Sequence, residues 1–140
     1  QYPAGYQLLG TTVYSQPGPV LGDANASAAR HFVTGATENG TNQGSASEVK
    51  IELARFRGRS DAARFWRRFT TDVQSISARG SMRHLGAGAT FVTGGCGCGT
   101  SGVDLYFWRG KIFASVETWP ASLATDLHLA KVIDHKLTAK

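Results

Sequence analysis

Val103–Trp119 reads VDLYFWRGKIFASVETW, and this stretch decides the fold. In residues 103–108, the aliphatic or aromatic side chains Val, Leu and Phe alternate with Asp, Tyr and Trp. In residues 112–117, Ile, Ala and Val alternate with Phe, Ser and Glu, and Arg109-Gly110 lies between the two arms. Such alternation about a short turn predicts a β-hairpin. Aromatic rings occupy both odd and even positions, so we expect both faces of the hairpin to be at least partly covered.

An amphipathic helix is predicted on each side of the hairpin in the sequence. The first begins at Ser60-Asp61, where Ser60 can cap the helix and Asp61 complements its dipole. Its apolar side chains recur at steps of three and four residues: Ala62, Phe65, Trp66, Phe69, Val73 and Ile76. The last helix begins at Ser122 or Thr125 and has a similar stripe: Leu123, Leu127, Ala130, Ile133 and Leu137. Its polar face holds His128, Lys131, His135 and Lys136.

The order of elements from residue 48 onward is therefore β-α-β-β-β-α, following an N-terminal strand and a possible short helix within residues 1–33. That short helix is expected at residues 24–32, capped by Asp23. Residues 34–47 contain no large apolar side chain, which predicts an exposed polar loop. Further strands are expected near residues 6–14, 48–56 and 82–92.

Helices with a single apolar stripe need a sheet to cover. We therefore predict an α+β fold: an antiparallel sheet of about four to five strands, with two main helices packed on one face. A chain of 140 residues suits a single domain, 1–140.

Composition excludes several classes of protein. A hydrophobic content of 41% excludes wholesale disorder, and no apolar run approaches the roughly 18 residues of a membrane helix. The net charge of +5 includes a basic patch that could neutralise phosphates: Arg55, Arg57, Arg59, Arg64, Arg67 and Arg68. No zinc finger, helix-turn-helix or RNA-binding sheet signature accompanies it, so we interpret it as a solvated face and expect no nucleic-acid partner.

Several features favour an exported chain whose leader has been removed. The chain starts at Gln1 without a signal peptide, and Ser, Thr, Asn and Gly crowd its first fifty residues. Asn25 and Asn39 are possible glycosylation sites, because each begins an Asn-x-Ser/Thr tripeptide. We expect an extracellular or cell-surface location.

The two cysteines, Cys96 and Cys98, stand in the glycine-rich loop GGCGCGTSG at residues 94–102. They could close a local disulfide, bind a soft metal or act as a thiol-redox pair. Their spacing is one residue shorter than Cys-x-x-Cys, and no second cysteine pair completes a four-thiolate site. In an exported chain a disulfide is the favoured interpretation, with no metal or other cofactor.

Catalytic motifs are absent from the sequence: neither Gly-x-Ser-x-Gly nor a Walker loop occurs, so we expect no enzyme. The candidate ligand-binding residues are aromatic or lie beside the hairpin turn: Trp66, Tyr106, Trp108 and Arg109. Aromatic residues at these spacings form either a pocket wall or the core, and both interpretations stay open.

Residues 83–137 resemble the C-terminal half of small exported lipoprotein-like or sensor-like domains of bacteria. The resemblance rests on the step His84-Leu85-Gly86-Ala87-Gly88-Ala89, the turn Arg109-Gly110-Lys111 and the closing helix Leu129–Leu137. With the strand-helix unit Val49–Phe69 it covers about two-thirds of the chain. The chain departs from that pattern at Ala87, at Lys111 and in the cysteine loop. The resemblance implies an extracytoplasmic α+β domain without known catalytic activity and transfers no site residues.

These observations together favour a non-enzymatic extracytoplasmic domain that binds a protein, a glycan or a small ligand. A structural subunit of an extracellular assembly or filament is the first alternative, with the tyrosine-rich N-terminal segment making subunit contacts. A thiol-redox or metal-binding protein that uses Cys96 and Cys98 is the second.

Overall fold

The computed structural model describes seven parts of the chain: residues 7–14, 26–33, 48–74, 78–82, 84–93, 103–119 and 122–139. Seven strands and two helices lie within them: β1 (Gln7–Tyr14), β2 (Ala26–Val33), β3 (Glu48–Arg55), α1 (Arg59–Gln74), β4 (Ala78–Ser81), β5 (Gly88–Thr93), β6 (Val103–Arg109), β7 (Ile112–Trp119) and α2 (Leu123–Thr138). The predicted loops at 34–47 and 94–102 lie outside the described residues.

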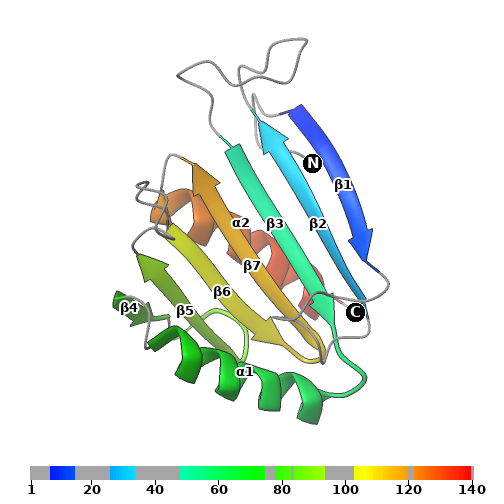
Figure 1. Ribbon diagram of the computed structural model, residues 1–140, viewed down its shortest axis with the longest axis vertical. Coiled ribbons are helices and arrows are strands. Elements are labelled where there is room, and N and C mark those ends of the chain that lie inside the picture. Colours follow the sequence, from blue (N-terminus) through cyan, green and yellow to red (C-terminus); the bar gives the residue numbers. More distant parts are fainter. Residues whose placement is uncertain are drawn as a thin grey trace.

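The seven strands form one antiparallel sheet in the order β1-β2-β3-β7-β6-β5-β4 (Figure 1). The predicted hairpin is confirmed, because β6 pairs with β7 from Val103 opposite Thr118 to Arg109 opposite Ile112. The pairing of β3 with β7 joins the first three strands to the last four. The α+β class with an antiparallel sheet and two helices is thus confirmed.

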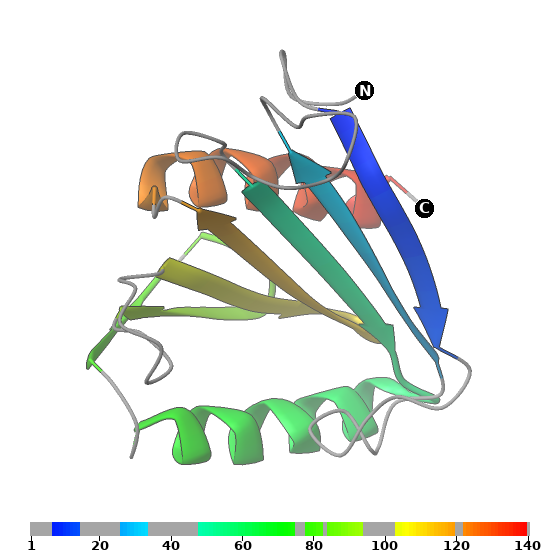
Figure 2. The same ribbon diagram turned by 45° about the horizontal axis from the view of Figure 1, so that its top comes forward.

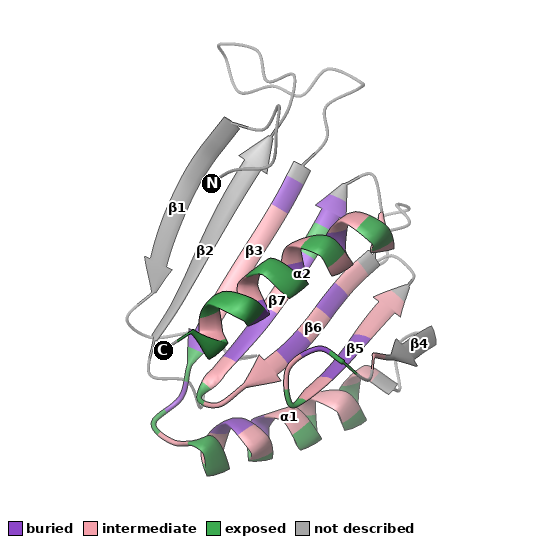
Figure 3. Ribbon diagram, turned by 180° about the vertical axis from the view of Figure 1, so that it is seen from behind, coloured by how far each residue is buried: buried purple, intermediate pink, exposed green. Residues whose placement is uncertain are grey.

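The sheet is wider than expected, with seven strands rather than four or five, and the helices lie on opposite faces of it (Figures 2 and 3). Successive side chains of a strand point to opposite faces. Tyr106 and Phe113 pack with α1, whereas Leu105 and Ala114 pack with α2. The physical reason is visible in the hairpin, whose odd and even positions both carry apolar groups, so that each face needs its own cover.

The α1 side of the sheet is filled mainly by aromatic rings. The ring of Phe65 on α1 lies 5.1 Å from Phe56 and 5.1 Å from Phe113, centroid to centroid. Ala54 and Ala62 complete the buried part of this cluster. We call these five residues the aromatic layer.

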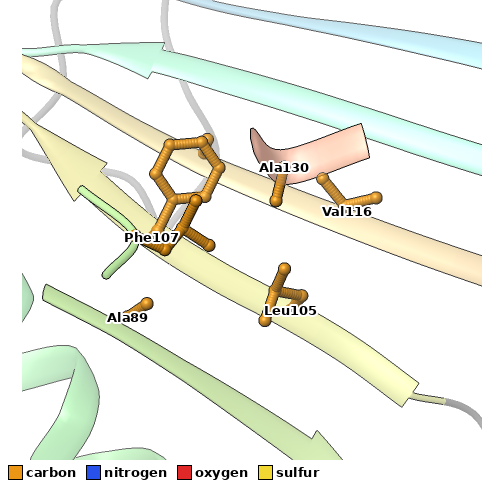
Figure 4. Close-up of a cluster of buried hydrophobic side chains, with 7 residues drawn as sticks. Ala89, Leu105, Phe107, Val116 and Ala130 are labelled. Carbon is orange, nitrogen blue, oxygen red and sulfur yellow. The ribbon is translucent and has the colours of Figure 1, made fainter. Parts of the chain in front are cut away.

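The α2 side is filled mainly by aliphatic side chains. Five of its buried members are visible in Figure 4, where they project from β5, β6, β7 and α2 toward one another: Ala89, Leu105, Phe107, Val116 and Ala130. Further aliphatic residues of β3 and α2 pack around them: Ile51, Leu53, Leu123, Leu129, Ile133 and Leu137. We call this cluster the aliphatic layer.

The short helix expected at residues 24–32 is wrong, since Ala26–Val33 forms β2. Each residue of β2 pairs with β3, and β1 pairs with β2 along its other edge. Two rows of interstrand hydrogen bonds outweigh the helix propensity of three alanines, which is a weak preference.

The helix boundaries agree in part with the sequence prediction. Of the two predicted starts of the last helix, Ser122 and Thr125, the structure has Ser122 as the N-cap of α2, and its hydroxyl accepts a hydrogen bond from the Thr125 amide at 3.3 Å. The cap expected at Ser60 is wrong, because α1 begins at Arg59 and the Ala62 amide donates to the Gly58 carbonyl at 3.2 Å. Ser60 therefore lies inside the first turn.

Candidate functional site

Three of the four predicted ligand-binding residues come together on the α1 side of the sheet. Trp66, Tyr106 and Trp108 are half-buried and pack against the aromatic layer. The Tyr106 ring lies 4.7 Å from Phe69 and 6.0 Å from Phe113, centroid to centroid. The core interpretation therefore fits these residues better than the pocket interpretation.

Gly88 explains how closely the two tryptophans pack. A Cβ atom at Gly88 would lie 3.0 Å from the Nε1 atoms of both Trp66 and Trp108, so a larger residue there would push the two indoles outward by a few tenths of an ångström. The Trp108 Nε1 atom is buried and has no hydrogen-bond partner among the described residues. The rings themselves occupy the space above Gly88, where a ligand would have to lie.

Arg109, the fourth candidate, projects from the opposite face and pairs with Asp134 on α2. Its Nε atom donates to Asp134 Oδ1, and its second guanidinium nitrogen donates to Oδ2 at 2.8 Å. The Gly86 amide donates to the same Oδ2 atom at 3.1 Å. The Arg109 hydrogen bonds, helped by the Gly86 amide, lower the pKa of Asp134 despite its burial.

This ion pair fixes the segment before β5 against α2. Gly86 has φ +63°, and the next amide, Ala87, donates to the Trp108 carbonyl at 2.8 Å. A Cβ at Gly86 would lie 2.4 Å from that carbonyl oxygen, so the segment needs glycine there. Leu85 beside it is buried in the aliphatic layer, and His84 is exposed.

A small groove lies between this fixed segment and α2, with a volume of about 200 Å³. Five residues line it, which we call the α2 groove: Met82, His84, Leu85, Leu127 and Lys131. Three lining side chains are apolar, while His84 and Lys131 are exposed and contribute the groups that can carry positive charge. The groove can hold an apolar group with a negative charge beside it.

The exposed side of α2 carries only basic and uncharged residues, which we call the outer face of α2: Ala124, His128, Lys131, Val132, His135, Lys136 and Thr138. The two acidic residues of helix α2, Asp126 and Asp134, are buried instead, with 0% and 8% of their surfaces exposed. Among the large hydrophobic residues whose burial the structure describes, Val132 alone is exposed, with 43% of its surface accessible. The outer face of α2 is therefore positively charged with an apolar residue within it.

Asp126 is buried beneath α2, and neither carboxylate oxygen has a hydrogen-bond partner among the described residues. The pKa of Asp126 is raised to about 7, chiefly by burial and in smaller part by the nearby carboxylates of Asp104 and Glu117. The Thr118 hydroxyl lowers the pKa without meeting the geometry of a hydrogen bond. The side chain is thus most stable in its neutral form.

Asp104 and Tyr106 form a second polar contact, on the α1 side. The Tyr106 hydroxyl donates to Asp104 Oδ2 at 3.1 Å. Burial raises the pKa of Asp104, and burial together with the neighbouring Asp104 carboxylate raises the pKa of Tyr106. Tyr106 therefore stays a neutral donor.

The six arginines of the predicted basic patch are all exposed, as a solvated face requires. Arg64 pairs with Asp61 at 2.6 Å on α1, and the Arg68 guanidinium carbon lies 5.9 Å from the centre of the Phe65 ring. Positive charge on this surface is therefore offset in part by Asp61 of the same helix.

Other predicted sites lie outside the described residues: Cys96, Cys98, Asn25 and Asn39. Within the described part of the chain, no group of three or more His, Cys, Asp or Glu side chains is placed to hold a metal ion. No helix in that part is long and apolar enough to span a membrane.

Comparison with known proteins gives no relative for this chain. No protein-family model matches it, and no curated protein or solved structure is significantly similar to it.

Proposed function

We propose that the chain is a non-enzymatic, extracytoplasmic protein-binding domain whose docking surface is the α2 groove together with the outer face of α2. The partner it fits is an acidic protein segment that carries one apolar anchor residue. The observation that carries the proposal is the charge of this surface: both acidic residues of α2 are buried, so every charged group on its outer face is basic.

The dimensions of the groove favour one side chain as its occupant. About 200 Å³ is less than the roughly 300–1,000 Å³ of sites that take drug-sized ligands. Met82, Leu85 and Leu127 supply apolar surface, and Leu85 is held from below by the aliphatic layer. A leucine-sized anchor in a groove that is already formed loses little free energy to reorganisation.

The charged groups around the groove supply the rest of the recognition. Lys131 and His84 line it on two sides, and His128 and His135 lie one helical turn from Lys131 on the exposed side of α2. Carboxylates that flank an apolar anchor would lie close to these side chains. Complementary charge of this kind steers association and selects against basic partners.

The chemistry of the groove favours binding over catalysis. Its five lining residues include no hydroxyl, thiol or carboxylate group, so His84 and Lys131 have no Ser, Cys, Asp or Glu partner within the lining with which to form a catalytic pair. A location outside the cytoplasm is supported by the polar, lysine-poor composition of the chain.

The test uses the peptide acetyl-Glu-Asp-Leu-Asp-Glu-amide and the ¹⁵N-labelled full chain. We expect the peptide to shift the amide signals of residues 84–85 and 127–132. A matched peptide with alanine in place of leucine should bind more weakly, since a buried leucine side chain contributes about 1.5–3 kcal/mol.

Two charge reversals on exposed helical residues provide the matched controls. Lys131→Glu should weaken binding roughly fivefold, because one attractive contact becomes repulsive. Arg67→Glu, on the outer side of α1, should leave binding within about twofold. The proposed surface would be contradicted if both variants weakened peptide binding equally or if the amide signals changed only in α1. It would also be contradicted if a lysine-rich peptide bound as tightly as the acidic one.

A further inference from the structure

The two edges of the sheet differ in length and in charge. β4 ends the sheet on one side with four residues, ARGS, which include the charged Arg79. β1 ends it on the other side with eight residues, QLLGTTVY, which include neither a charged residue nor a proline. Among the described strands, β1 pairs along one edge only, with β2.

Natural sheets protect their edges with short strands, charged side chains, prolines or bulges, because an open edge is a template for another strand. β4 is protected by its shortness and by a charged residue. β1 has only one of these protections, a bulge-like register shift between Leu8 and Gly10, and from Gly10 to Tyr14 its pairing with β2 is regular. Five consecutive residues of β1 therefore present a regular edge without protection of this kind.

We propose that β1 pairs with β1 of a second copy of this chain, antiparallel across a two-fold axis. A strand is complementary to itself in this arrangement, and the contact closes after two copies. Every neighbouring pair in the sheet is already antiparallel, so the sheet would continue across the axis without a change of pattern. Because β1 carries no charge, no like-charge repulsion opposes the contact.

The shortness of β4 decides between a closed pair and a filament. A filament would need β1 of one copy to pair with the other edge of the next copy. That edge offers four residues, including Arg79 and Gly80, so most of β1 would stay unpaired. The dimer contact lies at the opposite edge of the sheet from the β4–β5 segment that contributes Met82, His84 and Leu85 to the α2 groove, so pairing through β1 leaves the groove accessible.

Two proline variants of the full chain test the pairing. Successive residues of an antiparallel strand direct their backbone groups to opposite sides, so one of Thr12 and Val13 bonds to β2 and the other faces outward. Proline is tolerated on an edge strand where its nitrogen faces outward. One of Thr12→Pro and Val13→Pro should therefore keep the stability of the parent, while the other loses it.

Sedimentation equilibrium from about 1 μM to about 1 mM gives the result. We expect the parent to dimerise, amide exchange in β1 to slow as concentration rises, and the stable proline variant to stay monomeric. A parent that is monomeric at about 1 mM overturns the proposal, as does a stable proline variant that dimerises as tightly as the parent. Faster exchange in β2 identifies the variant that has lost its internal pairing.

Discussion

The α1 side of the sheet is packed with rings, several of them only partly buried, whereas the α2 side is packed with aliphatic chains around two buried aspartates. α1 is held by Ala62, Phe65, Trp66 and Phe69, all within its first three turns. α2 is held along its whole length, from Leu123 to Leu137, and by the Arg109–Asp134 ion pair. The difference indicates that one helix is attached by a few large contacts and the other by many small ones.

The largest expected effect comes from removing the central ring of the aromatic layer. Phe65→Ala should lower the free energy of unfolding by about 4 kcal/mol, because it leaves a cavity among Phe56, Phe69 and Phe113. It should also speed amide exchange in α1 selectively, since few other side chains hold that helix. Urea denaturation and native-state hydrogen exchange measure the two effects.

Leu105→Ala is the matched change in the aliphatic layer, with an expected loss of about 3 kcal/mol. Here exchange should rise across the whole protein rather than in α2 alone, because α2 keeps its other contacts. If each variant sped amide exchange only in the helix of its own layer, the contrast between few large contacts and many small ones would be wrong.

Asp126→Asn should change how stability depends on pH. The pKa of Asp126 rises from 3.8 to about 7 on folding, so the unfolded chain loses the proton first as pH rises. The free energy of unfolding of the parent should therefore fall between about pH 4 and pH 7 and change little above that range. The asparagine variant lacks this fall, and above about pH 7 the free energy of unfolding of the parent should have dropped by on the order of 4 kcal/mol relative to that of the variant.

Thermal or urea unfolding at a series of pH values measures this difference. Asp61→Asn is the control, because Asp61 is a partly exposed carboxylate of α1 that pairs with Arg64 at the surface. A parent and an Asp126→Asn variant with parallel pH profiles would show that the carboxyl is solvated in the folded protein.

Gly86→Ala and Gly110→Ala compare two glycines with nearly the same backbone conformation, φ +63° and φ +60°. A Cβ at Gly86 would lie 2.4 Å from the Trp108 carbonyl oxygen, whereas a Cβ at Gly110 meets nothing within 4 Å. Gly110→Ala should therefore cost about 1 kcal/mol, for the left-handed conformation alone. Gly86→Ala should cost about 2 kcal/mol or more and should loosen the α2 groove.

The two glycine variants are compared by urea denaturation, with binding of the acidic peptide as a second measurement. The Gly110 variant should bind the peptide as the parent does, because its turn lies outside the groove lining. Equal costs for the two variants would show that the segment before β5 can move away from Trp108.

Local periodicity was enough to predict α1, α2, β3 and the hairpin, because each of these elements buries a stripe of its own side chains. β2 could not be found in this way, since its sequence, ASAARHFV, has no clear period and its pairing with β1 and β3 decides its structure. Rings at both odd and even hairpin positions indicate that each face of the sheet is covered, as the structure shows. A two-layer fold, with both helices on one face, was predicted instead because it is a common way to cover a sheet.

The contacts that α2 makes through its buried aspartates could not be predicted from the sequence. Arg109 and Asp134 are 25 residues apart, and only the fold brings them together. One signal was present: Asp126 and Asp134 stand four residues before and after Ala130, on the buried stripe of α2. An acidic residue at such a position indicates either an ion pair or an unpaired carboxyl, and α2 contains one of each.

The central pairing of β3 with β7 also has a consequence during protein synthesis. β3 is complete at Arg55, but its partner begins at Ile112, so the ribosome must first make residues 56–111. At about 5–20 residues per second this takes roughly 3 to 11 seconds. Throughout that interval the nascent β1-β2-β3 unit exposes the strand edge that later becomes the middle of the sheet. A chain truncated within this interval would keep that edge open as a template for another strand.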